Sequence, residues 1–143
     1  MAKDLSPKEE FNELSFYTLG HSDTVYFIHQ HIVDAFQAQT ADENTKPISI
    51  IFSLIGLYLY IEKMYTGRQV QQAHMKLAQN KKVWPMLDLP KQKGTITVSD
   101  VLKTEPGQTR DIIIKEWCSS VWTAYKNWHE VIATLARTEL KVR

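Results

Sequence analysis

The sequence has little cysteine, glycine or proline: one, five and five residues among 143. The single cysteine, Cys118, excludes a disulfide within the chain, which fits a reducing compartment. No glycine-rich loop matches the phosphate-binding or dinucleotide-binding fingerprints, and no internal repeat is present. Otherwise the composition is that of a globular protein, with 43% hydrophobic and 23% charged residues. We therefore expect a single domain over residues 1–143.

Long hydrophobic segments are also absent. The longest apolar run, residues 48–61, has 14 residues, whereas about 20 are needed to cross a bilayer. The opening residues, MAKDLSPKEEF, carry charges where a signal peptide needs an apolar core. The net charge of +1 argues against a general nucleic-acid binder. We therefore expect a soluble, cytoplasmic protein that binds neither membranes nor nucleic acids.

Charge is distributed unevenly along the chain. Residues 1–62 carry three Lys against nine Asp and Glu, whereas residues 63–103 carry seven Lys and one Arg against two Asp. One interpretation is that the acidic and basic segments partly cancel each other in the fold. The alternative is that segment 63–103 forms a basic patch for a small acidic ligand, such as a phosphate.

The apolar run predicts the centre of an all-α helical bundle. Twelve of the fourteen residues in 48–61 are apolar or glycine, so a helix formed by them has no solvent face. This places a buried helix at about 47–64, in which Gly56 indicates the close approach of a neighbour. Apolar residues at helical spacing predict three main surrounding helices, at about 23–39, 67–82 and 109–140.

The remaining segments are expected to cover this bundle. Prolines and a glycine punctuate residues 84–107, but Trp84 and Leu87 make this mostly irregular segment too apolar for a free linker. It should pack over the helices. Residues 1–20 and 137–143 are expected at the periphery.

Histidines are the main candidates for chemistry. His29, His74 and His129 lie on or beside the apolar stripes of three different helices. Facing helices can build metal sites from inward side chains, and a divalent transition metal (Zn, Ni, Fe or Mn) with Glu62 as a further ligand fits these residue types. The competing interpretation is that these histidines are structural and hydrogen-bonded, because no His pair at i, i+4 is present to favour chelation.

Two further sets are candidates for a polar pocket. His31 and Asp34 are three residues apart on one predicted helix, where the carboxylate can orient the imidazole or raise its pKa. A solvated surface pair is the simpler interpretation. Arg68 follows Gly67 at a predicted helix start, where backbone N–H groups can hold an anion. An exposed helix face explains that group equally well.

Several stretches resemble a family of uncharacterised bacterial proteins with a domain of unknown function. They are HSDTVYFIHQHIVDAFQAQ, KPISIIFSLIGLYLYIEKMYTGRQVQQAHMKLA, WPMLDLPKQKGTITVSDVL and WCSSVWTAY, which together span most of the chain from His21 to His129. The resemblance implies a bacterial source and a small stand-alone domain, and brings no activity. By analogy the chain is also similar to the DinB-like helical bundles, which hold a metal with three histidines, but it lacks their paired histidines on the last helix.

Two functions follow from these observations. The first is a small helical binding or interaction module without catalysis, whose 84–107 segment and basic segment contact a partner. The second is a metal-dependent enzyme of DinB-like type, a hydrolase or transferase, that uses His29, His74 and His129. Surplus Trp and Tyr surface also suggests a homodimer.

Overall fold

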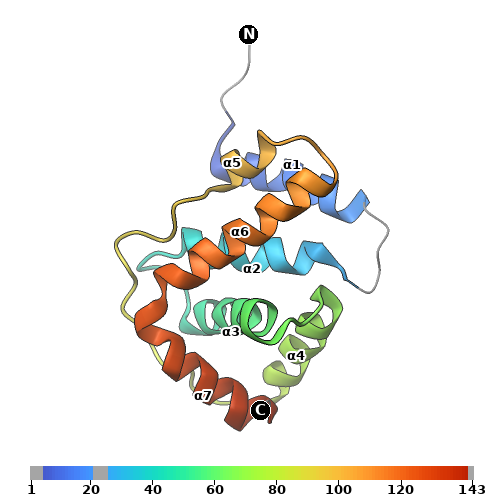
Figure 1. The fold of residues 1–143 in the computed structure, drawn as a ribbon. Helices are drawn as coiled ribbons and strands as arrows, with labels where there is room; N and C mark the ends of the chain where they lie inside the picture. Colours follow the sequence, from blue (N-terminus) through green and yellow to red (C-terminus); the bar gives the residue numbers. More distant parts are fainter. Residues whose placement is uncertain (1–4, 21–25, 142–143) are drawn as a thin grey trace.

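The computed structural model describes residues 5–20 and 26–141, and in these residues it contains seven α-helices, one short 3₁₀ helix and no strand (Figure 1). The all-α bundle is therefore confirmed. None of the described helices is long and apolar enough to cross a bilayer. The elements are α1 (Pro7–Gly20), α2 (Ile28–Thr40), α3 (Pro47–Lys63), α4 (Gly67–Gln79), α5 (Val98–Leu102), α6 (Gln108–Ala124), η1 (Lys126–Trp128) and α7 (His129–Leu140).

Helix α3 is the buried centre that the apolar run predicted. It packs against α2, α4, α6 and α7, and Figure 1 shows it enclosed by these helices. Ile51, Leu54, Ile55 and Leu59 on this helix are fully buried. Proline at its first turn and Met64 in a left-handed conformation just past its end fix its limits.

Helix α2 is more deeply buried than its apolar stripe indicated. Ile32 and Ala35 on that stripe are fully buried, but His31 and Asp34 on the adjacent face are only 3% and 2% exposed. The interpretation of His31 and Asp34 as a solvated surface pair is therefore wrong. The reason is that α2 packs against α1, α3, α4 and α6, which leaves it little solvent face. The predicted start at residue 23 lies outside the described residues.

The long helix predicted at 109–140 is broken in the structure, so that prediction is wrong. Helix α6 ends at Ala124, and η1 intervenes before α7. Three side chains hold the break: the Tyr125 hydroxyl donates to Ala38 O at 2.6 Å, Trp128 Nε1 donates to Asp88 O at 2.8 Å, and His129 Nε2 donates to Trp122 O at 2.7 Å. The break redirects α7 onto α3 and α4.

The segment between α4 and α6 covers the bundle as expected. Trp84 and Leu87 are each 7% exposed, and the side-chain amide of Gln39 donates to the carbonyls of Lys93 and Ile96 at 3.0 and 2.7 Å. Helix α5 within it begins with a capping box in which Thr97 is the N-cap. At the other end of the chain, α1 packs against α2 and α5.

Candidate ligand-binding pocket

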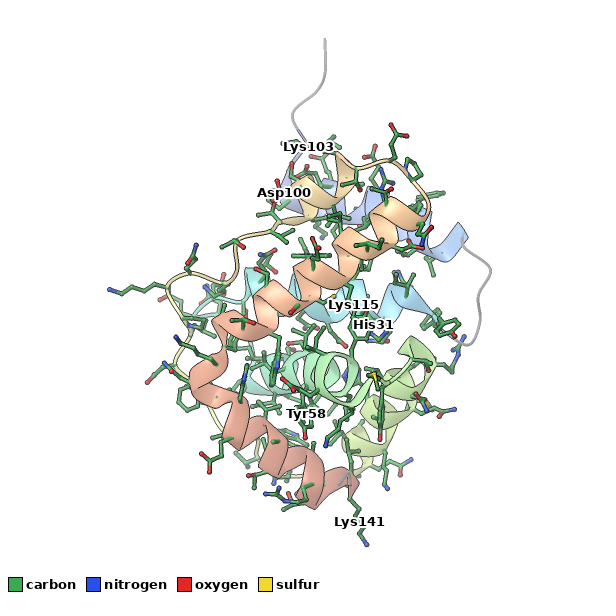
Figure 2. All side chains as sticks on the ribbon, viewed as in Figure 1. His31, Tyr58, Asp100, Lys103, Lys115 and Lys141 are labelled. Carbon is green, nitrogen blue, oxygen red and sulfur yellow. The ribbon has the colours of Figure 1, made fainter. Side chains whose placement is uncertain are left out.

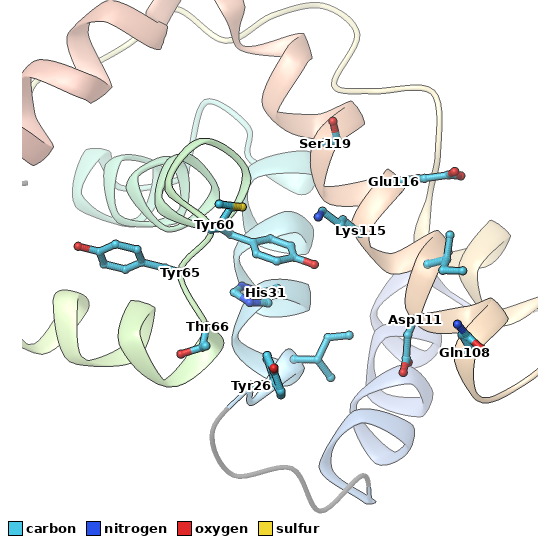
Figure 3. Close-up of a pocket in the computed structure, with 13 residues that line it drawn as sticks. Tyr26, His31, Tyr60, Tyr65, Thr66, Gln108, Asp111, Lys115, Glu116 and Ser119 are labelled. Atoms are coloured by element: carbon cyan, nitrogen blue, oxygen red, sulfur yellow. The ribbon is translucent and has the colours of Figure 1, made fainter. Parts of the chain in front are cut away.

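A pocket of about 780 Å³ opens between α2, the end of α3, the start of α4 and α6 (Figure 3). That volume lies within the range of sites that hold small organic molecules. His31 of α2 and Lys115 of α6 both line it, and Figure 2 labels these two residues near the middle of the molecule.

The inner wall is a stacked pair of rings. His31 and Tyr60 lie parallel, with ring centroids 3.5 Å apart and an interplanar angle of 7°. Figure 3 shows the hydroxyl end of Tyr60 and the amine end of Lys115 extending toward one another across the pocket. Burial raises the pKa of Tyr60, so its hydroxyl stays protonated and can donate a hydrogen bond.

His31 is a neutral imidazole with one unpaired nitrogen. Burial lowers its pKa to about 3. Its Nδ1 is sealed from solvent and has no hydrogen-bond partner among the described residues. A proton on Nδ1 would be a buried N–H without an acceptor, which costs more than a buried lone pair. The proton therefore belongs on Nε2, the nitrogen that remains available to the pocket.

Helix α6 supplies the charged side of the pocket. Asp111 and Lys115, four residues apart, both line it, and Tyr17 donates to Asp111 Oδ1 at 2.8 Å. Among the described residues the contacts between ionisable groups of opposite sign are Lys82 with Glu139 and His74 with Asp34. The ammonium of Lys115 thus has no carboxylate within ion-pair distance in the described part of the chain.

The mouth of the pocket is apolar and exposed. Tyr26, Met64 and Ile112 line it and are 65%, 82% and 52% exposed. Apolar side chains held open to water around a pocket are typical of binding sites.

Two tight backbone contacts shape this mouth. Gly67 N donates to Tyr26 O at 2.5 Å, and a Cβ on Gly67 would lie 1.8 Å from Phe27 O. Phe27 itself has left-handed backbone angles (φ 42°, ψ 58°). Gly67 is therefore required for the close approach of α4 to the start of α2, which positions Tyr26 at the pocket.

The sequence of the described fold was compared with known proteins. It matches a family of unknown function, DUF5946, over residues 7–126. The chain belongs to this family. No curated protein and no solved structure matches it. All residues that line the 780 Å³ pocket lie inside the matched region, whereas His129 and α7 follow it.

A second polar cluster lies where α2 and α4 meet α3. The Gln30 amide donates to Asp34 Oδ1 at 3.3 Å, and His74 Nε2 donates to Phe52 O at 2.8 Å and lies 3.9 Å from Asp34 Oδ1. Burial raises the pKa of Asp34 well above its ordinary value and lowers that of His74. Burial thus favours the neutral form of each group. A smaller cavity of about 300 Å³ adjoins them.

Among the residues predicted as metal ligands, His29 and His74 have different partners, whereas His129 and Glu62 both contact Trp122. His29 Nδ1 is hydrogen-bonded to Thr18 Oγ1 at 3.0 Å, and His74 lies in the cluster with Asp34. His129 stacks on the Trp122 ring with centroids 3.7 Å apart, and Glu62 Oε2 accepts from Trp122 Nε1 at 2.9 Å.

Across the described residues, no group of three or more His, Cys, Asp or Glu is arranged to hold a metal ion. A metal held by His29, His74, His129 and Glu62 stays a prediction from the sequence, and its test is metal analysis after purification with added Zn, Ni, Fe or Mn.

Arg68, the remaining pocket candidate, packs its guanidinium over the Phe27 ring, 4.3 Å from the ring centroid. Two of the N–H groups that start α4 are already used: Gly67 N donates to Tyr26 O, and Gln69 N donates to Thr66 Oγ1. Arg68 therefore supports the pocket mouth through Phe27 and does not line the pocket.

The low pKa of His31 makes stability depend on pH. The unfolded chain takes up a proton on His31 near its ordinary pKa of about 6.5, whereas the folded protein does so only near 3. Stability from this group is thus present above about pH 6.5 and falls as pH decreases. We expect a loss of about 2–3 kcal/mol between about pH 6.5 and 4.5.

The variant His31→Phe keeps a ring against Tyr60 and has no proton to take up. Urea unfolding at both pH values should show a smaller loss in His31→Phe than in the wild type. Other buried histidines contribute equally to both proteins and cancel in the difference. An identical loss in the two proteins would contradict the prediction.

Proposed function

We propose that the protein is a binding protein for a small organic molecule, which occupies the 780 Å³ pocket between α2, α3 and α6. The observation that carries this proposal is that a buried imidazole, His31, lines a pocket of ligand size beside an unpaired cation, Lys115. Lys115 is exposed to solvent, whereas burial of the His31 imidazole costs folding free energy unless a hydrogen-bond partner compensates it. A ligand supplies that partner.

The shape of the pocket supports the same function. Its mouth exposes Tyr26, Met64 and Ile112, and its inner wall is a rigid stack of His31 on Tyr60. Apolar walls with a few fixed polar groups provide affinity and orientation, respectively.

The experiment is a titration of isotope-labelled protein with a panel of neutral, anionic and cationic aromatic fragments, followed by amide NMR. Binding should shift the signals of pocket residues on α2, α3 and α6. Ile112→Trp fills the mouth and should abolish these shifts. Val83→Trp adds the same side chain at a position that is 94% exposed and outside the pocket, and it should leave them intact.

Shifts that survive in Ile112→Trp, or that lie away from the pocket, would contradict this assignment. A panel in which no fragment binds would contradict the proposed function itself.

The proposal includes a cytoplasmic location and a bacterial source, as the composition and the resemblance to bacterial proteins indicated. A small acidic ligand at the basic segment 63–103 and a homodimer stay predictions. The pocket takes Met64, Tyr65 and Thr66 from that segment, but its lysine comes from α6.

A further inference from the structure

We propose that the ligand of this pocket is a flat organic anion, an aromatic carboxylate whose acid group binds between Lys115, Tyr60 and His31. This inference rests on the proposed function and adds the chemical class of the ligand. It joins three observations: the hydrogen-bond donors that face the pocket, a lysine of α6 without an ion-pair partner among the described residues, and the apolar mouth.

The polar groups of the inner wall are donors. The ammonium of Lys115 donates only, and the neutral His31 offers N–H at Nε2 because Nδ1 is sealed. Tyr60 keeps its phenolic proton because burial raises its pKa. Three helices thus bring donors to one pocket, and a carboxylate, whose two oxygens only accept, is complementary to them.

Three charged side chains of α6 line the pocket, the carboxylates Asp111 and Glu116 and the ammonium of Lys115. Lys115 has no carboxylate within 4.0 Å among the described residues. Asp111 accepts a hydrogen bond from Tyr17. Glu116 points away from Tyr60 and His31 in Figure 3. Lys115 is exposed to solvent and outside ion-pair distance of the described carboxylates, and it is therefore the charge that an anionic ligand can reach beside Tyr60 and His31.

The apolar mouth favours an aromatic ring as the non-polar part of the ligand. Tyr26, Met64 and Ile112 surround the opening with apolar side chains. A thioether and an aromatic ring both pack well against a flat ring. A carboxylate at the inner wall therefore leaves the ring of the ligand between these side chains.

The test uses two probes of nearly equal shape, naphthalene carboxylate and naphthalene carboxamide, and calorimetric titration of the full chain. We expect the carboxylate to bind about tenfold more tightly than the amide, the ratio that one partly desolvated charge contact supplies. Lys115→Met keeps the length of the side chain and removes its charge. It should weaken the carboxylate about tenfold and leave the amide unchanged.

Lys76→Met is the matched control, because Lys76 is an exposed lysine within α4 that does not line the pocket. It should change neither affinity. Equal affinities for the two probes, equal weakening of both by Lys115→Met, or no binding of the carboxylate would each overturn the inference. The proposed function survives these results if the amide or another fragment binds at the pocket and Ile112→Trp blocks it, so the two failures are distinguishable.

Discussion

Gly67→Ala is expected to destabilise the fold by about 3 kcal/mol or more, among the largest effects of any single substitution in this chain. The added Cβ would lie 1.8 Å from Phe27 O and 2.6 Å from Tyr26 O. Both are backbone atoms of a turn that cannot rotate away. Phe27 is already in a left-handed conformation, so the turn has little freedom to relax.

Relief of this clash requires α4 to move away from the start of α2. That movement breaks the hydrogen bond from Gly67 N to Tyr26 O and the packing of Arg68 on Phe27. The mouth of the pocket should therefore open together with the loss of stability. Ligand binding in Gly67→Ala should weaken even at temperatures where the variant remains folded.

Gly20→Ala is the control, because a Cβ at Gly20 meets no atom of the described residues within 4 Å. Urea unfolding of the two variants provides the measurement. Gly20→Ala should stay within about 0.5 kcal/mol of the wild type. A cost below about 1 kcal/mol for Gly67→Ala would show that the turn at Tyr26 and Phe27 yields easily, which contradicts its role in shaping the pocket.

The sequence was sufficient to locate α3 because the residues of that helix themselves predict its burial. A run that is apolar on every face has one stable environment, the centre of the bundle. The limits of α3 at Pro47 and Lys63 also follow local rules, since proline suits a first turn. Gly67, in contrast, was placed correctly at a helix start, but its close contact with the start of α2 carries no local sequence signal.

The break between α6 and α7 could not be predicted from local pattern. Apolar spacing continues through Tyr125 and Trp128 as if the helix were unbroken. The atoms that hold the break, Ala38 O and Asp88 O, belong to segments far away in the sequence. Tertiary hydrogen bonds here prevail over helical propensity.

The residues of the pocket could be predicted only in part from the sequence, for a similar reason. His31 was a candidate because of its residue type, but Tyr60, Asp111 and Lys115 carried no signal of their own. Tyr60 belongs to the apolar run and was counted as scaffold, while Lys115 reads as an ordinary helical surface lysine. Only the crossing of α2, α3 and α6 brings them to one cavity.

The second large effect is expected at Gly56, where α2 crosses α3. A Cβ on Gly56 would lie 2.0 Å from Asp34 Oδ2 and 3.1 Å from His74 Nε2. Asp34 is 2% exposed, and a movement of its carboxyl into the adjoining cavity of about 300 Å³ would break its hydrogen bond with Gln30. We therefore expect Gly56→Ala to cost about 2–3 kcal/mol in urea unfolding, through overpacking at the crossing of α2 and α3.

Removal of the Asp34 carboxyl should reverse most of that cost. Asp34→Ala alone is expected to change stability little at about pH 7, because two contributions oppose each other. The lost contacts leave a small cavity. The opposing contribution comes from protonation. Burial raises the pKa of Asp34, so the stability that this carboxyl contributes at low pH is lost as pH rises. The variant Asp34→Ala has no carboxyl and therefore does not lose stability in this way.

A double-mutant cycle therefore separates the clash from other effects of the extra methyl group. The double variant Gly56→Ala/Asp34→Ala should be more stable than Gly56→Ala by at least about 1.5 kcal/mol, a coupling expected only for side chains in direct contact. The approach of Asp34 to Gly56 is then what sets the distance between α2 and α3. If the changes in unfolding free energy of the two single variants are additive in the double variant, the clash is instead with His74 of α4, because its imidazole is the other side chain near that Cβ.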